Sequence, residues 1–214
     1  MNVWGRVFAA VYDRVMARTE QAGLAERRRR LLSQLHGAVV EVGAGTGANL
    51  AAYPLGAIDE LVLVEPEAPM AKRLRQRLQA VNAPAARVLT APAESIPLPD
   101  ASFDFAVCTL VLCTVSDPAR ALSELRRLLK PGGQLLFLEH VRSDDPMIAR
   151  WQDRFHPLWL RIGHGCHCNR STLDSIHAAG FEVTVLERGR MPKAFALVKP
   201  MIVGAAQAQA YGPY

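Results

Sequence analysis

Three glycines at alternate positions follow a short β-branched segment. The segment covers residues 38–42, and Gly43, Gly45 and Gly47 come directly after it. Helical spacing of apolar residues resumes at Asn49. A strand, a glycine-rich turn and a helix form an anion-binding site, because the N–H groups and the dipole at the helix N-terminus face the ligand. Dinucleotide-binding loops space their glycines as G-x-G-x-x-G, so this tighter loop predicts a ligand without a pyrophosphate.

A carboxylate ends the next apolar segment. Glu65 follows residues 61–64 and stands roughly 20 residues after the glycine loop, the offset at which nucleotide-binding folds place a ribose-binding carboxylate. A carboxylate accepts hydrogen bonds from both ribose hydroxyls, which an apolar side chain cannot do. The alternative is an ordinary strand-end carboxylate, but the upstream glycine loop favours a role in binding.

The elements that must position these residues alternate between strands and helices. Short apolar segments predict strands over residues 38–42, 61–65, 87–89, 103–108 and 134–139. Helical spacing and capping signals predict helices over residues 24–34, 68–81, 117–129 and 171–179. Strands with nearly continuous apolar residues indicate a parallel sheet that is covered on both faces. We therefore expect a single-domain, Rossmann-like, doubly wound α/β sheet.

The last third of the chain departs from this alternation. Residues 181–186 and 195–198 both have strand character, and no room for a helix lies between them. They predict an antiparallel hairpin at the edge of the mostly parallel sheet.

Length, composition and charge indicate how many cores the chain can form and whether it binds nucleic acid. The chain has 214 residues, of which 50% are hydrophobic, and a net charge of +5. This length allows one well-buried core. The basic segments 27–30 and 72–77 are followed by leucines at helical spacing and lack interleaved aromatic residues, so they predict solvated helix faces rather than a nucleic-acid site.

The sequence also indicates a compartment. No apolar segment approaches the ~20 residues of a membrane span, and the N-terminus lacks the layout of a signal peptide. In a chain of this kind the four cysteines are expected to be free thiols. We therefore expect a cytoplasmic protein.

Two later segments resemble the class I S-adenosylmethionine-dependent methyltransferases. Residues 93–104 read AESIPLPDASFD and residues 129–133 read LKPGG, and both match motifs of that family. With the glycine loop and Glu65 they make four motifs in the family's order. The resemblance implies S-adenosyl-L-methionine as cofactor and S-adenosyl-L-homocysteine as product. It also implies one methyltransferase domain over residues 1–214, with cap helices in 1–36 and the catalytic core in 37–214.

The resemblance implies a set of cofactor-binding residues. The glycines should lie beneath the methionine moiety, with Glu41 near its ammonium group, and Glu65 should hold the ribose hydroxyls. The whole set is Glu41, Gly43, Gly45, Gly47, Asn49, Glu65, Pro66, Ala93, Glu94, Cys108 and Thr109. One departure is Pro92, which stands where many members carry an aspartate that meets the adenine amine. Adenine recognition should therefore rely on backbone groups or on Glu94.

A closer resemblance begins at about Val40 and is to the methyltransferase-like alkyl-thiol S-methyltransferases. It is carried by residues 41–49, 107–113 and 139–141, and by the Gly165-Cys166 pair with Arg170. It implies a small lipophilic acceptor, with a thiol sulfur as first choice. Quinone, phenol or phospholipid head-group methyltransferases remain alternatives within enzymes. A catalytically silent cofactor-binding interaction module is the alternative outside them.

The same relatives are membrane-associated through an added N-terminal hydrophobic segment. This sequence shows no such segment, so membrane attachment is not carried over, although peripheral membrane contact stays open. Nucleic acid is not an expected partner, and the sequence leaves the oligomeric state open.

Histidines near the expected acceptor side are the candidate catalytic residues. His140 ends the fifth strand, at the sheet edge where such folds bind their ligands. His164 and His167 lie in the segment 164–168, which also holds two cysteines. A free thiol with a pKa of ~8.5 is only a few per cent thiolate at neutral pH, so a nearby base or cation would assist it.

No metal is expected from this spacing. Structural zinc sites draw ligands as C-x₂₋₄-C pairs with a distant second pair, and residues 164–168 lack that arrangement. Methyl transfer needs no enzyme thiol, so Cys108 and Cys113 are expected to be small core residues.

Aromatic residues complete the expected site. An N-terminal amphipathic helix carries Trp4, Phe8, Val11, Tyr12 and Val15 on one face. Its Tyr12-Asp13 pair resembles the segment that caps the cofactor in related enzymes, and simple packing on the sheet is the alternative. Further on, an apolar acceptor pocket is expected between the fifth strand and the next helix, walled by Trp151, Phe155, Trp159 and Leu160.

Overall fold

The structure is a computed structural model that describes residues 13–14, 16–81 and 83–209. The expected N-terminal helix residues Trp4, Phe8, Val11, Tyr12 and Val15 lie outside the described residues. Asp13 of the expected cap is described.

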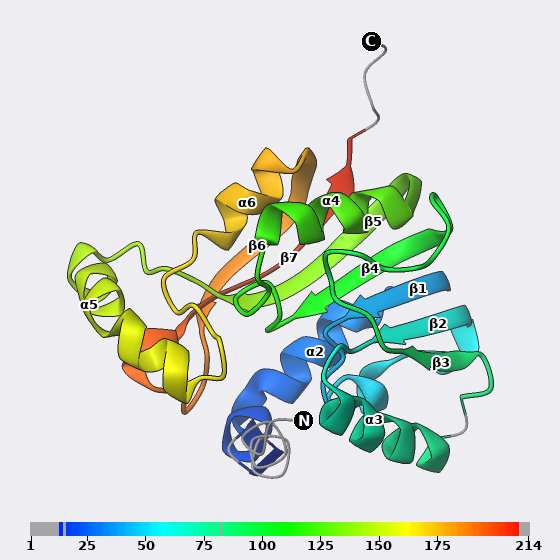
Figure 1. The fold of residues 1–214 in the computed structure, drawn as a ribbon, viewed down its shortest axis with the longest axis horizontal. Coiled ribbons are helices and arrows are strands. Elements are labelled where there is room, and N and C mark those ends of the chain that lie inside the picture. The colour runs from blue at the N-terminus through cyan, green and yellow to red at the C-terminus, as the bar shows by residue number, and fades with distance from the viewer. Residues whose placement is uncertain (1–12, 15, 82, 210–214) are drawn as a thin grey trace.

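Within the described residues, seven strands form one sheet in the order β3-β2-β1-β4-β5-β7-β6 (Figure 1). Their bounds are β1 Gly37–Val42, β2 Ile58–Val64, β3 Ala86–Leu89, β4 Phe103–Thr109, β5 Leu129–His140, β6 Phe181–Arg190 and β7 Pro200–Ala208. Strands β1 to β5 pair in parallel, whereas β7 is antiparallel to both β5 and β6. The expected Rossmann-like, mostly parallel sheet is confirmed. Its strand order reverses between β1 and β4, where such sheets bind their ligands.

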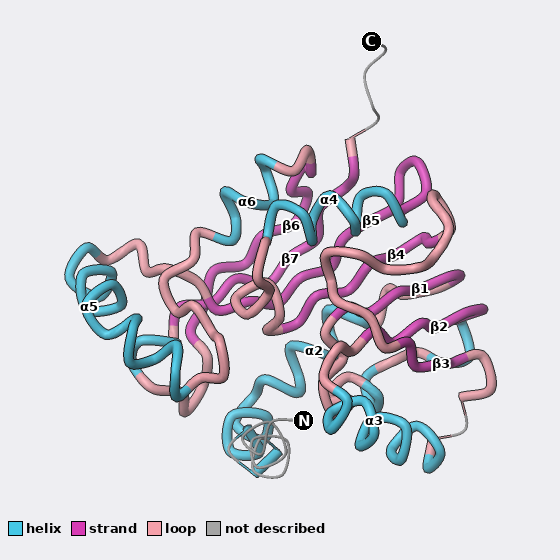
Figure 2. Tube along the Cα trace, viewed as in Figure 1, coloured by secondary structure: helices cyan, strands magenta, loops and turns pink. Residues whose placement is uncertain are grey.

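Helices cover both faces of the sheet. The α-helices are α2 Ala25–Leu32, α3 Ala68–Ala80, α4 Pro118–Leu128, α5 Pro146–Ile162 and α6 Thr172–Ala178. Shorter helical segments are η1 Glu20–Leu24, η2 Leu50–Ala52, η3 Leu55–Ala57 and η4 Ala196–Val198. Helices α2 and α3 lie on one face and α4 and α6 on the other, while loops set α5 apart from the sheet (Figure 2). Among the described residues, no helix combines the length and apolar character that crossing a membrane requires.

The alternation of strand residues builds one core on each face. Val40 belongs to the cluster that contains Leu125 of α4, whereas the neighbouring Val39 belongs to the cluster that contains Leu32 of α2 and Leu74 of α3. All five side chains are fully buried. Because both faces are covered, these strands need apolar residues at every position, and this explains their continuous apolar segments.

Helix α4 begins as its sequence predicts. The Asp117 side chain accepts a hydrogen bond from the backbone N–H of Arg120 at 3.0 Å, and Pro118 takes the first helical position. The cap satisfies one of the free N–H groups that every helix start exposes.

The sequence prediction of the last strand was wrong. Residues 196–198 form the helical turn η4, which Phe195 directly precedes, and the strand that pairs with β6 is β7. The middle of β7 reads Gly-Ala-Ala, and these small residues have little intrinsic preference for strands. They are buried there because β7 lies between β5 and β6. The expected antiparallel hairpin at the edge of the sheet is nevertheless confirmed, and it consists of β6 and β7.

The turn expected at residues 130–133 is also placed differently. The structure includes these residues in β5, where the pairing with β4 shifts register between Phe103 and Phe105. Gly132 has a φ of 81°, a left-handed conformation that suits glycine. The motif therefore forms an irregular start of β5 rather than a separate turn.

Gly204 in β7 offers a direct test of this packing. A Cβ at this position would lie 2.2 Å from the carbonyl oxygen of Val185 and 2.6 Å from Cζ of Phe137. Gly204→Ala should therefore lower the free energy of unfolding by about 2–3 kcal/mol, measured by chemical denaturation. Gly56→Ala is the matched control, because nothing lies within 4 Å of its added Cβ. Equal stability of the two variants would contradict this packing.

Candidate functional site

The glycine loop leaves the carboxyl end of β1 in a left-handed backbone conformation. The φ angles are 67° at Gly43, 58° at Gly45 and 89° at Gly47. At Gly43 an added Cβ would lie only 1.7 Å from Cγ2 of Val111. Glycine is therefore required here both for the backbone angle and for the close approach of the loop that follows β4.

Glu65 lies directly beside this loop. Its Oε2 accepts a hydrogen bond from the N–H of Gly45 at 2.8 Å, and its Oε1 accepts one from the N–H of Glu67 at 2.8 Å. Burial raises the pKa of the Glu65 carboxyl, and the two backbone N–H groups partly offset that rise. Each carboxylate oxygen keeps a second lone pair, so the side chain can accept from a diol as well.

Glu41 supports the loop from within the protein. The hydroxyl of Tyr53 donates to its Oε2 at 2.5 Å, and Nδ2 of Asn49 donates to its Oε1 at 2.7 Å. Burial raises the pKa of Glu41, while these two hydrogen bonds and the charge of Arg28 oppose the rise. The expected contact of Glu41 with the methionine ammonium stays a prediction.

Arg28 is a site residue that the sequence prediction missed. It is 3% exposed, and its Nη1 donates at 2.8 Å to both Oδ1 of Asn49 and Oγ1 of Thr109. Its Nη2 also pairs with Oε1 of Glu20 at 3.1 Å. A buried guanidinium thus connects α2 to the residue before η2 and to the end of β4.

The solvated helix face expected for residues 27–30 is wrong for this one residue. Arg29 and Arg30 are exposed as expected. Arg28, however, stands four residues after Leu24 and three before Leu31, on the apolar stripe of the helix. That spacing was the available signal, and the run of four arginines hid it.

The chain before α2 also reaches the glycine loop. Oγ1 of Thr46 donates to Oδ1 of Asp13 at 2.6 Å, and Nη2 of Arg77 pairs with Oδ2 of Asp13 at 2.5 Å. Arg77 further donates to the carbonyl oxygen of Thr46 at 3.0 Å. These contacts favour the capping interpretation of Asp13, while Tyr12 lies outside the described residues.

The segment expected near adenine is held in place by Glu94. Its Oε1 accepts from the N–H groups of Ser116 at 2.9 Å and Asp117 at 3.1 Å, so Glu94 also fixes the start of α4. Ala93 is buried, whereas Pro92 and Pro66 are exposed.

Cys108 and Thr109 end β4 and have different surroundings. Cys108 is fully buried in the core, and burial raises its pKa well above the usual range of a thiol. It is the small core residue that its sequence context predicts. Thr109 is nearly buried and accepts the hydrogen bond from Arg28.

Three soft ligand atoms converge at the neighbouring strand end. Cys113, His140 and Cys166 are all buried, and their ligand atoms lie within 4.8 Å of one another. We call these three residues the thiol cluster. Nε2 of His140 lies 2.9 Å from Sγ of Cys166, and Nε1 of Trp159 donates to the same sulfur at 3.1 Å. The three come from the loop after β4, the end of β5 and the loop after α5.

The hydrogen bonds of the thiol cluster favour a thiolate at Cys166. The thiol of Cys113, then His140 and Trp159, lower the pKa of Cys166 to about 4 against the opposing effect of burial. Correspondingly, the bond to Cys166 raises the pKa of Cys113. Burial disfavours the charged form of His140, but the Cys166 contact and Glu139 outweigh it and raise the pKa of His140. Cys113 is therefore buried as expected, yet it belongs to a polar cluster.

One short segment joins the glycine loop to the thiol cluster. The carboxylate of Glu139, at the end of β5, accepts from the N–H groups of Val111 at 2.9 Å and Leu112 at 3.0 Å. Val111 is the residue that packs on Gly43, and Cys113 follows two positions later. The expected cofactor side and the thiol cluster are thus neighbours in space.

The structure separates the residues of the segment 164–168. Cys166 joins His140, whereas His167 turns to α5, where its Nδ1 lies 2.9 Å from Nε2 of His156. Cys168 is buried against the carbonyl oxygen of Gln152. His164 has a left-handed φ of 52° at the loop that follows α5.

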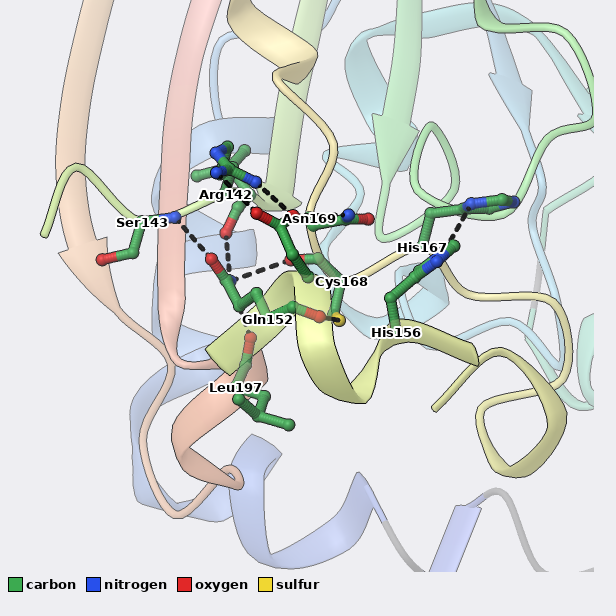
Figure 3. A network of polar contacts seen from close by, with 10 residues as sticks. Arg142, Ser143, Gln152, His156, His167, Cys168, Asn169 and Leu197 are labelled. Atoms are coloured by element: carbon green, nitrogen blue, oxygen red, sulfur yellow. Dashed lines mark hydrogen bonds and ion pairs between the residues drawn. The ribbon is translucent and has the colours of Figure 1, made fainter. Parts of the chain in front are cut away.

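A buried glutamine fixes α5 to this loop (Figure 3). Nε2 of Gln152 lies 2.8 Å from the carbonyl oxygens of both Cys168 and Leu197, and its Oε1 accepts from the N–H of Ser143 at 2.8 Å. Beside it, Asp153 pairs with Arg142. Because Gln152 is fully buried, these contacts hold α5 against the segments on both sides of it.

Helix α5 carries an aromatic stripe. Trp151 and Phe155 stack with ring centroids 5.4 Å apart, and both are more than a third exposed. With Ile148, Ala196 and Leu197 they line an open apolar depression of about 460 Å³. Trp159 stands one helical turn further along the same face and reaches Cys166. In the described part of the chain, Trp151 and Phe155 are therefore the only two of the four expected wall residues that line the depression.

Comparison with known proteins places the fold in a family. Residues 40–137 match the model of a methyltransferase domain. The human thiol S-methyltransferase TMT1B is 37% identical over 84% of this chain and 78% of that protein. The human thiol S-methyltransferase TMT1A is 32% identical over 93% of this chain and 82% of that protein. A ubiquinone/menaquinone biosynthesis C-methyltransferase from Ectopseudomonas mendocina is 32% identical over 69% of this chain and 60% of that protein.

Solved structures agree with this assignment. A S-adenosylmethionine-dependent methyltransferase from Thermotoga maritima, described as a possible histamine N-methyltransferase, matches with a TM-score of 0.70 at 27% identity, covering 95% of this chain and 97% of that one. A putative methyltransferase from Bacillus halodurans shares the fold with a TM-score of 0.71 at 17% identity, covering 86% of this chain and 99% of that one. The chain therefore belongs to the S-adenosylmethionine-dependent methyltransferases, in the family that includes the thiol S-methyltransferases.

Proposed function

We propose that this methyltransferase transfers the methyl group of S-adenosylmethionine to the sulfur of a small lipophilic thiol. The similarity to the human thiol S-methyltransferases carries the proposal, because it extends well beyond residues 40–137 of the methyltransferase domain. At 93% coverage it includes most of the segment 145–199, which supplies α5 and the loop with Cys166. This segment lies on the acceptor side of the site.

The cofactor would lie across the ends of β1, β2 and β4. In this arrangement Gly43, Gly45 and Gly47 support the methionine moiety, and Glu65 accepts from the ribose hydroxyls. The hydrogen bond between Glu65 and Gly45 supports this assignment, because it keeps the carboxylate next to the glycine loop. Residues 1–36 then act as a cap on the core of residues 37–214, as the contact of Asp13 with Thr46 suggests.

The acceptor would approach from the side of the thiol cluster. Methyl transfer is an in-line displacement in which the cofactor supplies the electrophile, so the protein must position the sulfur and exclude water. The aromatic stripe of α5 offers an apolar path that ends at Trp159 beside Cys166. We propose that His140 helps the acceptor sulfur to ionise. We also propose that His164 and His167 belong to the segment that covers the bound acceptor.

A quinone or phenol acceptor is the second candidate. The ubiquinone/menaquinone relative favours it, but that similarity covers less of this chain than the similarity to the thiol S-methyltransferases. We further propose a cytoplasmic location, because a chain with four free cysteines suits a reducing compartment.

The ribose assignment predicts a loss of cofactor binding in Glu65→Ala. Hydrogen bonds to charged groups contribute about 1.5–3 kcal/mol each, so loss of two should weaken binding of S-adenosylhomocysteine by about 100-fold or more in isothermal titration. Burial raises the pKa of Glu65, so this carboxylate becomes protonated at a higher pH than an ordinary one. The affinity of the wild-type protein for S-adenosylhomocysteine should therefore decrease as the pH is lowered, and the decrease should begin above the usual pKa range of a carboxyl group. Asp59→Ala, at the exposed opposite end of β2, should bind normally. Retained affinity in Glu65→Ala would show that the ribose lies elsewhere.

The acceptor class is tested by a panel of hydrophobic thiols, phenols and amines assayed for release of S-adenosylhomocysteine. Thiols should be turned over in preference to phenols of matched size, since a thiol needs less help to ionise at neutral pH. Turnover of phenols but not of thiols would replace the first candidate by the second.

The aromatic stripe predicts a change in KM. In the double variant Trp151→Ala/Phe155→Ala, KM for a long-chain thiol should rise about tenfold, because apolar contact area is lost. The kcat should stay unchanged, since this contact is equal in the ground and transition states. Leu158→Ala removes a similarly exposed side chain of α5 that does not line the depression. An equal effect of both variants would argue against an acceptor path along the stripe.

A further inference from the structure

We propose that Cys113, His140 and Cys166 form a Zn²⁺ site whose fourth position takes the sulfur of the acceptor thiol. This inference rests on the proposed thiol acceptor. It departs from the expectation of no metal, which rested on the spacing of cysteines and histidines within residues 164–168. The three ligands come from separate segments, at positions 113, 140 and 166.

The ligand set suits zinc. Two cysteines and one histidine, with one open position, form a known type of catalytic zinc site. Zinc bonds of about 2.3 Å to sulfur and about 2.0–2.1 Å to nitrogen place tetrahedral ligand atoms roughly 3.5–3.8 Å apart. The three ligand atoms already lie within 4.8 Å of one another. The 2.9 Å separation of His140 and Cys166 would widen by less than about 1 Å.

The surroundings suit the charge of a metal thiolate. Two cysteine thiolates neutralise Zn²⁺, and a thiolate from the acceptor would bring the site to a charge of −1. The guanidinium of Arg170 interacts electrostatically with both Cys113 and Cys166 and would offset that charge. It is held by a hydrogen bond of 2.6 Å from its Nη1 to the carbonyl oxygen of Leu112.

Two of the ligands are held by contacts outside the cluster. The carbonyl oxygen of Cys113 accepts from the N–H of His167 at 2.8 Å, and Trp159 donates to the sulfur of Cys166 at 3.1 Å. His140 belongs to the end of β5, in the middle of the sheet. A preformed cluster of this kind loses little conformational entropy when it binds a metal.

The location of the cluster suits an acceptor site. On one side, the segment from Val111 to Cys113 connects it to the glycine loop at Gly43. On the other side, Trp159 connects it to the aromatic stripe of α5.

The reaction balances without an oxidant or reductant. The acceptor thiol binds the metal through sulfur and releases its proton to solvent. A lone pair of that sulfur then attacks the methyl carbon, a new carbon–sulfur bond forms, and the bond to the sulfonium breaks with its electron pair going to S-adenosylhomocysteine. The neutral thioether is a weaker ligand than a thiolate and leaves the metal.

Metal content and cobalt spectra test the site without turnover. The purified full chain should retain about one equivalent of zinc by elemental mass spectrometry. With Co²⁺ in its place, it should show the near-ultraviolet absorption of cobalt–thiolate bonds. Addition of a lipophilic thiol in the presence of S-adenosylhomocysteine should increase that absorption, because a third thiolate joins the metal.

Variants assign the ligands. Cys113→Ala and Cys166→Ala should each weaken zinc binding at least 100-fold, whereas Cys168→Ala, a buried cysteine outside the cluster, should bind zinc like the wild type. Titration with S-adenosylhomocysteine would confirm that each variant is folded. A wild-type chain without metal affinity, equal zinc binding by all three variants, or a disulfide between Cys113 and Cys166 in freshly purified protein would each overturn the proposal.

The two proposals fail in different ways. If Co²⁺ binds but its spectrum does not change when the thiol is added, the acceptor sulfur does not take the fourth ligand position, and that part of the proposal is overturned. If zinc is absent while thiols are methylated, the proposed function stands and the metal site is overturned. Turnover of phenols instead of thiols would overturn the proposed function, whatever the metal content.

Discussion

The carboxylate of Glu139 is buried at the end of β5, where it binds the backbone of the loop that leaves β4. A fully buried carboxylate is costly unless it is hydrogen-bonded, and burial indeed raises the pKa of Glu139. The N–H groups of Val111 and Leu112 offset this cost. This pairing fixes the loop between the glycine loop and the thiol cluster. Val111 can then pack on Gly43, and Cys113 can meet His140 on the next strand.

A second set of buried polar groups lies on the other side of the same loop. Arg28 donates to Asn49 and Thr109, and Asn49 donates in turn to Glu41. Each member of this network is satisfied by another, which is the condition under which buried charges are tolerated. The network ties α2, β1 and β4 together beneath the glycine loop. The surroundings of the glycine loop are therefore cross-linked by buried hydrogen bonds, which suits a reaction that depends on positioning.

Much of the fold could be predicted from the sequence, because the strands β1 to β5 are covered on both faces and their apolar segments are continuous. The positions of the glycine loop and Glu65 were predictable because each directly follows an apolar strand, and the hydrogen bond between Gly45 and Glu65 confirms that they lie side by side. Strand β7 was missed because its centre consists of a glycine and two alanines; the packing of Phe137 and Val185 requires the glycine, Gly204. Local patterns carry no record of such tertiary contacts.

The same limit applies to the thiol cluster. The position of His140 at the end of a strand was predictable from the sequence. Its partners Cys113 and Cys166 were not, because the three residues lie far apart in the chain and only the sheet brings them together. Arg28 was difficult to predict for a related reason. It is the buried residue in a run of four arginines, and the residue type alone does not distinguish it from its neighbours.

The most direct measurement uses one acceptor that carries both a thiol and a phenol, with S-adenosylmethionine labelled with carbon-13 in its methyl group. Nuclear magnetic resonance distinguishes a methyl carbon on sulfur from one on oxygen in the product. We predict that the wild-type protein places the label on sulfur. A label on oxygen would contradict the account of this protein as a thiol methyltransferase.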